Sequence, residues 1–221
     1  AVGKIPLNVS KSAIDLLTLS GHKLHAPKGV GALFIRKGIT FTPFVVGGHQ
    51  EKNRRGGTEN VPSIIGLGRA CELAKKYMSE EQILVKQLRD KVEDEILEKA
   101  PDVRVNGHKT KRLPNTTNLS FEFVEGEAIL LLLNERGICA SSGSACTSGS
   151  LEPSHVLRAM GVPFTAVHGS VRLSLSRYNT IEEVDYIVEH LPPIIRRLRE
   201  ISTYSRETKV KGKVDKISAR V

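Results

Sequence analysis

Two short apolar runs dominate the first forty residues of the chain. Residues 16–20 and 30–36 each have the length of a buried strand, and a turn containing Pro27 and Gly29 separates them. Lys23 stands at the exit of the first run, so we expect two strands to hold its amine in a fixed place. Such an amine can form a Schiff base with a carbonyl, whereas most lysines are solvated surface charges. Position alone leaves both interpretations open.

Helical spacing of apolar residues follows between residues 60 and 100. Asn60 can cap a helix that Pro62 enters in its first turn, and Cys71 falls on the apolar face of that helix. Residues 79–82 then have the spacing of a capping box, and apolar residues recur at helical intervals up to Ala100. The pattern predicts two consecutive helices or one kinked helix, with Cys71 packed in a core.

The rest of the chain alternates short strands with short helices. We expect strands at 103–105, 117–123 and 171–177, and helices at 126–136, 153–160 and 180–199. Gly137 and Gly161 are placed to end two of these helices, and Pro192 with Pro193 should bend or restart the last one. Cys139, in a short apolar stretch, is expected to be a buried strand residue. The mixture predicts an α/β chain.

Composition narrows the class of protein. At 221 residues and 39% hydrophobic content the chain can form a packed core, and it has neither an apolar run of membrane-spanning length nor the pattern of a signal peptide. We therefore expect a cytoplasmic protein without membrane contact. Its three cysteines lack metal-ligand spacing, so we expect reduced thiols and no metal site. The net charge of +9, with 5% aromatics and no nucleic-acid motif, fits an acidic protein partner and does not lead us to expect nucleic acid.

Two glycine-rich segments could carry chemistry. Residues 37–60 hold five glycines and one proline, with Arg54 and Arg55 among them. This composition suits the approach of backbone to an anion but is also typical of an ordinary loop. Residues 141–150 consist only of Ser, Gly, Ala, Cys and Thr, and Cys146 lies among them. That composition indicates a mobile loop, and a linker with an incidental thiol is the plain alternative.

Three motifs, taken in order, resemble one family. They are Ser20-Gly21-His22-Lys23 with the Pro27–Gly31 turn, the segment Arg55–Asn60, and Ser141–Ser148 continuing to Ser154. Together they are similar to the pyridoxal-phosphate cysteine desulfurases of the class V aminotransferase superfamily. The resemblance covers residues 1 to about 202 and corresponds to the C-terminal part of a family member.

The resemblance implies a fold-type I transferase. Residues 1–60 would be the C-terminal end of the large, cofactor-binding domain, 61–100 connecting helices, 101–204 the small α+β domain, and 205–221 a basic flexible tail. That tail carries a net charge of +4 over residues 206–221. The resemblance also implies that the residues holding the pyridine ring precede Ala1, so we expect this chain alone to lack part of the active site.

The resemblance also implies the roles of individual residues. Lys23 would bind pyridoxal 5'-phosphate covalently, with Ser20, Gly21 and His22 beside it and Thr58 reaching the cofactor phosphate of a second subunit in a homodimer. Arg172 would hold the substrate carboxylate, because a guanidinium can form two parallel hydrogen bonds to it, and Cys146 would carry the persulfide.

The function expected from the resemblance is the removal of sulfur from L-cysteine. The products would be L-alanine and a persulfide passed to an iron-sulfur scaffold or another sulfur-acceptor protein. The alternatives are a class V aminotransferase, a selenocysteine lyase, or a catalytically incomplete fragment that serves as a binding partner. The Ser/Gly-rich cysteine loop favours the desulfurase.

Overall fold

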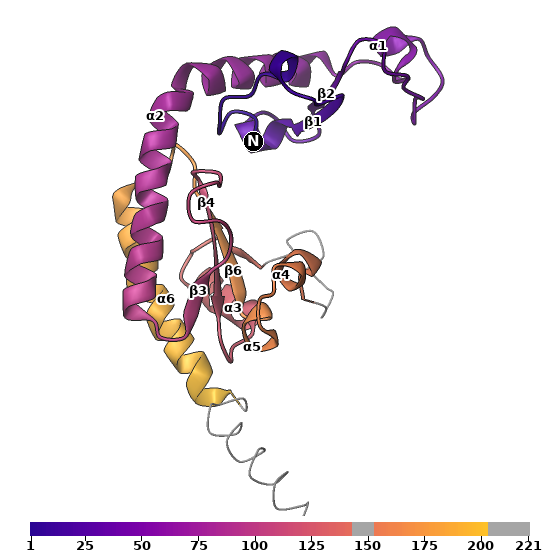
Figure 1. Ribbon diagram of the computed structural model, residues 1–221. Helices are drawn as coiled ribbons and strands as arrows, with labels where there is room; N and C mark the ends of the chain where they lie inside the picture. Colours follow the sequence, from indigo (N-terminus) through magenta and orange to yellow (C-terminus); the bar gives the residue numbers. More distant parts are fainter. Residues whose placement is uncertain (143–152, 203–221) are drawn as a thin grey trace, which may run out of the picture. The chain divides into compact units, whose positions relative to one another are not determined.

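A computed structural model describes residues 1–142 and 153–202 of the chain (Figure 1). It divides into two compact units, Ala1–Gln82 and Ile83–Val221. The first unit holds a two-stranded sheet of order β1-β2, and the second holds a four-stranded sheet of order β3-β4-β6-β5. Helix α2 (Val61–Lys99) contributes residues to both units.

The first unit is built on an antiparallel hairpin. Strand β1 (Leu16–Ser20) pairs with β2 (Gly31–Ile35), and the 3₁₀ helix η2 (Gly21–Leu24) begins directly after β1. Another 3₁₀ turn, η1 (Val9–Lys11), precedes them. Both predicted strands are present and Lys23 lies between them, but the predicted burial was wrong, because Leu16 is 49% and Leu33 is 41% exposed.

A small apolar cluster fixes the hairpin against the start of α2. Leu24 and Ala26 pack on Leu67 and Ala70, and the half-buried Cys71 contacts the same cluster. The prediction that Cys71 is a packing residue is confirmed. Because side chains of both the turn and the helix belong to this cluster, η2 packs directly against the start of α2.

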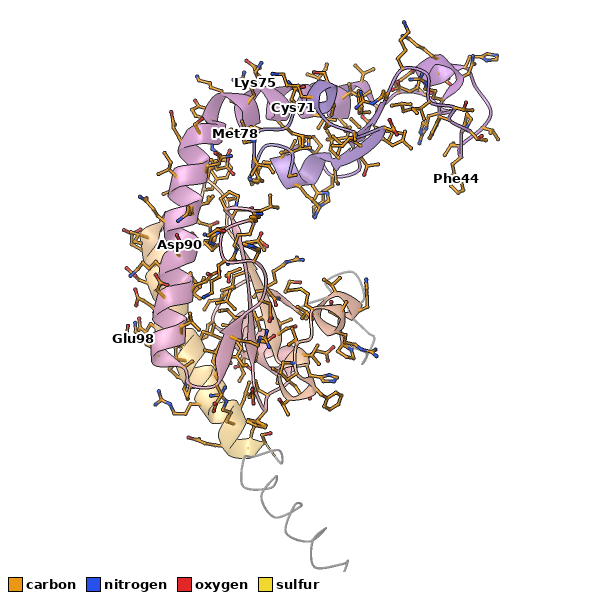
Figure 2. The ribbon with its side chains drawn as sticks, viewed as in Figure 1. Phe44, Cys71, Lys75, Met78, Asp90 and Glu98 are labelled. Carbon is orange, nitrogen blue, oxygen red and sulfur yellow. The ribbon has the colours of Figure 1, made fainter. Side chains whose placement is uncertain are left out.

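The loop between the hairpin and α2 contains one short helical turn, α1 (Gln50–Asn53). Its residues Glu51, Lys52 and Asn53 all have positive φ, between 50° and 64°, so this turn is left-handed and unlike a regular α-helix. Phe44 projects from the same loop and is 97% exposed (Figure 2). The expected loop is confirmed, apart from this turn.

Helix α2 runs without interruption from Val61 to Lys99. The Asn60 side-chain oxygen accepts a hydrogen bond from the backbone N–H of Ser63 (3.3 Å), as the predicted cap requires. The later part of α2 buries Val85, Leu88, Val92 and Ile96, four positions at helical spacing. The predicted capping box at 79–82 lies inside this one helix and starts no second one.

The second unit packs helices on a twisted sheet. Its strands and helices are β3 (Val103–Val105), β4 (Thr116–Phe121), α3 (Gly126–Glu135), β5 (Ser141–Ser142), α4 (His155–Ala159), α5 (Phe164–Val167), β6 (Ser170–Ser174) and α6 (Ile181–Ile201). Figure 1 shows the later part of α2, from Ile83 on, and α6 side by side along one face of this sheet, and Lys91 of α2 pairs with Asp185 of α6. Phe121, Leu119 and Val171 are fully buried beneath these helices.

Most predicted elements of this unit are confirmed. Gly137 and Gly161 have φ of 72° and 71° and follow α3 and α4, as expected for residues that end helices. The box formed by Thr180 and Glu183 caps α6, which continues through Pro192 without a break. The second strand ends at residue 121 and the third at residue 174, so both are shorter than predicted.

The prediction for Cys139 was wrong. Ile138 is buried, whereas Cys139 is exposed and precedes the short strand β5. Neighbouring residues of extended chain point to opposite sides, so burial of Ile138 turns Cys139 outward. Cys139 is one of the residues that line an open cavity of about 510 Å³ between the end of α3, β6 and the start of α6.

Candidate functional site

A tight turn gathers four of the predicted site residues. Ser20 ends β1, and Gly21, His22 and Lys23 form η2. The Ser20 hydroxyl and the His22 Nδ1 atom are 2.9 Å apart and hydrogen-bonded. His22 and Lys23 are exposed, so the hydroxyl, the imidazole and the amine are all available to a ligand at one end of the hairpin.

Backbone contacts fix the shape of this turn. The Gly21 N–H donates to the Val30 carbonyl (2.9 Å), and the Ala26 N–H donates back to the Gly21 carbonyl (3.0 Å). Gly21 is buried, and a Cβ atom there would lie only 2.8 Å from the Val30 oxygen. His25 closes the turn with φ of 64°. A residue larger than glycine at position 21 would therefore push η2 away from β2.

Thr58 lies in the same unit on a separate loop. It is exposed, and no hydrogen bond of its side chain is recorded within the described residues. The Gly56 N–H donates to the Val45 carbonyl (2.8 Å) and the Gly57 N–H to Gln50 Oε1 (3.1 Å), which fixes the two residues before Thr58. The loop thus presents the Thr58 hydroxyl while using its own glycine N–H groups internally.

Arg172 belongs to the second unit, where it occupies the middle of β6. It pairs across the sheet with Asn118 of β4 on one side and Ser141 of β5 on the other. Arg172 is half-buried, and its Nε atom is buried without a hydrogen-bond partner. Arg172 forms no ion pair with any residue of 1–142 or 153–202, so the guanidinium retains donors for an anionic ligand.

The predicted thiol of Cys146 lies outside the described residues. The described chain stops before it in β5, which pairs with β6 beside Arg172, and resumes at residue 153 shortly before α4. The start of the predicted loop is therefore anchored at the strand that carries Arg172.

A row of polar residues beside Arg172 was missed by the sequence analysis. Asn106, next to β3, donates from its amide nitrogen to Asn118 Oδ1 (2.6 Å) and to Ser120 Oγ (2.7 Å). Residues 116, 118 and 120 of β4 are polar and lie on the face opposite Leu119 and Phe121. This alternation, which Thr117 interrupts, is the sequence signal that could have revealed the row.

None of the helices in the described ranges combines the length and the apolar character that a membrane-spanning segment needs.

Comparison with known proteins gives consistent matches. The family model described as aminotransferase class-V matches residues 1–187. "Cysteine desulfurase 2" of Trichormus variabilis is 61% identical over 207 residues, which are 94% of this chain and 52% of that protein. "Cysteine desulfurase NifS" of Azotobacter vinelandii is 59% identical over 204 residues, 92% of this chain and 51% of that protein.

A solved structure agrees with the sequence matches. The NifS-like protein from Rickettsia africae superimposes with a TM-score of 0.80 at 36% identity and covers 88% of this chain and 51% of its own. The predicted α/β, fold-type I class is thereby confirmed. The chain spans about half the length of the curated relatives it matches.

Proposed function

The chain belongs to the aminotransferase class-V family, and on that basis we propose that it acts in a cysteine desulfurase. The reaction converts L-cysteine to L-alanine and leaves the sulfur as a persulfide on Cys146. One observation carries the proposal: the exposed turn with Ser20, His22 and Lys23 occurs in a chain 61% identical to a protein named cysteine desulfurase.

The turn fits one end of pyridoxal 5'-phosphate. The Ser20 hydroxyl and the His22 imidazole are suited to hydrogen-bond phosphate oxygens, and the Lys23 amine, one residue further on, is suited to bond an aldehyde carbon. Gly21 keeps these three groups close to β2. Ser20 and His22 would hold the phosphate group of the cofactor, and Lys23 would bond its aldehyde carbon. No described residue is assigned to the pyridine ring.

Pyridoxal phosphate, when bound, supplies an electron sink that stabilises negative charge at the substrate α-carbon. The residues of this chain supply the remaining steps. Arg172 holds the carboxylate of L-cysteine through charge-assisted hydrogen bonds. The amine of Lys23 takes the α-proton as a general base.

Cys146 then accepts the sulfur. Its thiolate attacks the substrate sulfur, an S–S bond forms, and the bond between the substrate Cβ and its sulfur breaks with the electron pair passing to carbon. Protonation of that carbon fragment gives alanine. The overall change is a thiol plus cysteine going to a persulfide plus alanine, so no external oxidant or reductant is needed.

The assembly and partners form part of the proposal. Thr58 lies on a loop of its own with a free-standing hydroxyl, which suits contact with the cofactor phosphate of the second subunit in a homodimer. The persulfide would pass in the cytoplasm to an iron-sulfur scaffold or another sulfur-acceptor protein. Residues 1–60 would complete the cofactor domain, 61–100 connect it, 101–204 form the small domain and 205–221 a basic tail.

The test is product analysis of the native holoenzyme supplied with L-cysteine. We expect alanine and protein-bound persulfide in equal amounts during a single turnover. Transfer of the amino group to a keto acid without persulfide would identify an aminotransferase instead. Release of selenide from selenocysteine, with no reaction of cysteine, would identify a selenocysteine lyase.

A further inference from the structure

The four-stranded sheet carries one continuous row of polar side chains across its width. Asn118 pairs with Arg172, Arg172 pairs with Ser141, and the Asn106 N–H donates to the Asn118 carbonyl (2.8 Å). Directly opposite residues in antiparallel strands point to the same face, with Cβ atoms about 5 Å apart. The side chains of Asn118 and Arg172 are therefore immediate neighbours on the face opposite Leu119 and Val171.

The amide of Asn118 is oriented by its neighbour on the other side. Asn106 is only 7% exposed, and its amide nitrogen donates to Asn118 Oδ1 (2.6 Å) and to Ser120 Oγ (2.7 Å). Asn118 thus turns its carbonyl oxygen toward β3. The two polar atoms of a carboxamide lie on opposite sides of its carbon, so the Asn118 nitrogen, which can donate two hydrogen bonds, is directed away from β3.

The cost of this arrangement indicates that it serves a purpose. Asn106 Oδ1 is buried without a partner, and Ser120 is fully buried, so a polar anchor is maintained in the sheet at the expense of stability. On the far side of Asn118, Arg172 Nε is likewise buried and unpartnered. Within the described residues, neither the cationic Arg172 Nε nor the neutral Asn118 amide nitrogen has a hydrogen-bond acceptor.

We propose that Asn118 is a substrate-binding residue, whose amide nitrogen binds the same carboxylate as Arg172, and that Asn106 is the positioning residue that orients it. This inference rests on the proposed function, because the carboxylate is that of the amino-acid substrate. A carboxylate has two oxygens and room for about four hydrogen bonds, so it can occupy both donors at once. A neutral amide beside the guanidinium adds a hydrogen bond to the carboxylate and brings no further charge to the site.

The sharpest test is Asn118→Asp in the native holoenzyme. Aspartate has nearly the same shape and can still accept the hydrogen bond from Asn106, but it replaces the donor beside Arg172 by a negative oxygen. We expect KM for L-cysteine to rise at least about tenfold, as for the loss of a charge-assisted hydrogen bond. The kcat and the absorbance of bound cofactor should stay within about twofold of wild type.

Asn134→Asp is the matched control, because it makes the same chemical change at an exposed position of α3. It should leave KM unchanged. If Asn118→Asp lowers the melting temperature, the KM of Asn118→Ser is the test instead, because serine introduces no charge. We expect this variant to raise KM for L-cysteine by a smaller factor. Loss of cofactor and kcat together with KM, in both variants, would show a merely structural role and overturn the proposal.

A second readout does not depend on turnover. The Nε–H resonance of Arg172, assigned by its disappearance in Arg172→Lys, should shift and exchange more slowly with water in Asn118→Asp, because Nε gains an acceptor. An unchanged resonance would refute the neighbouring placement of the two side chains. If the wild-type enzyme forms no alanine from cysteine, the proposed function fails, and this resonance still decides whether Asn118 faces Arg172.

Discussion

Gly21→Ala tests whether the turn carrying Lys23 is held in place by close packing. The added methyl group would lie 2.8 Å from the Val30 carbonyl oxygen, 2.9 Å from Val30 Cγ1 and 3.1 Å from the Ala26 side chain. The first contact is with the backbone of the residue directly before β2, which cannot rotate away as a flexible side chain could. Either η2 or the β2 end of the hairpin must move.

The expected loss follows from that overlap. Inserting a methyl group into a packed site costs about 1–3 kcal/mol. The hydrogen bond from the Gly21 N–H to Val30 (2.9 Å) would also lengthen, and an intramolecular hydrogen bond contributes about 0.5–1.5 kcal/mol. We therefore expect the free energy of unfolding of the first unit to fall by about 2–4 kcal/mol.

The same displacement moves Ser20 and His22 relative to each other. We expect the affinity for pyridoxal phosphate to fall by at least about tenfold, because aligned hydrogen bonds to a charged phosphate weaken steeply with misplacement. Urea unfolding of the apoprotein measures the free energy of unfolding, and a cofactor titration followed by absorbance measures the affinity for pyridoxal phosphate.

Gly68→Ala is the matched control. Gly68 is an exposed residue of α2 in the same unit, and a Cβ atom there meets nothing within 4 Å. Alanine should stabilise the helix by up to about 1 kcal/mol and leave cofactor affinity unchanged. If Gly21→Ala behaves like Gly68→Ala in both assays, the turn is not held by packing and the reasoning is refuted.

Three further predictions concern single residues. Lys23→Ala should abolish the cofactor adduct that borohydride reduction traps on the protein, and an adduct recovered on another lysine would contradict the assignment. Arg172→Ala should weaken substrate binding by about 2–5 kcal/mol while cofactor absorbance is retained, and Arg172→Lys should restore only part of the loss. The pKa of Glu183 is lowered from its ordinary 4.5 by hydrogen bonds from the Asn179 side chain and then the Thr180 backbone. Its contribution to stability should therefore be complete above pH 4.5 and be lost as pH falls through the lower folded pKa, and urea unfolding should show no such loss in Glu183→Gln.

Two controls separate these effects from misfolding. Arg104→Ala removes an exposed arginine from β3 of the same sheet and should leave substrate binding unchanged. Equal losses of cofactor and substrate binding in Arg172→Ala would instead indicate a folding role. A stability profile of Glu183→Gln that follows wild type at every pH would contradict the assigned role of the carboxylate.

Local sequence rules predicted the elements that depend on neighbouring residues. The cap at Asn60 and the helix end at Gly137 follow from contacts within a few positions, and both are confirmed. Such contacts do not depend on the tertiary packing around the helix, so the sequence alone is sufficient to predict where the helix begins and ends.

Features that depend on distant residues could not be predicted in this way. Cys139 is exposed because Ile138 takes the place in the core, and nothing in that apolar stretch tells which of the two is buried. The row formed by Asn106, Asn118 and Arg172 requires the order and register of three strands, and two of its members, Asn118 and Arg172, are more than fifty positions apart. Long-range pairing of this kind is set by the packing of the whole sheet.

The most direct test of the central claim is mass spectrometry of the cysteine-containing peptides after the holoenzyme has reacted with L-cysteine. The account predicts one added sulfur atom on the peptide of Cys146 and none on those of Cys71 or Cys139. Cys146→Ser should abolish alanine formation, whereas Cys139→Ser, which alters an exposed thiol outside the proposed site, should not. Sulfur found on Cys71 or Cys139, with turnover retained in Cys146→Ser, would contradict the proposed function.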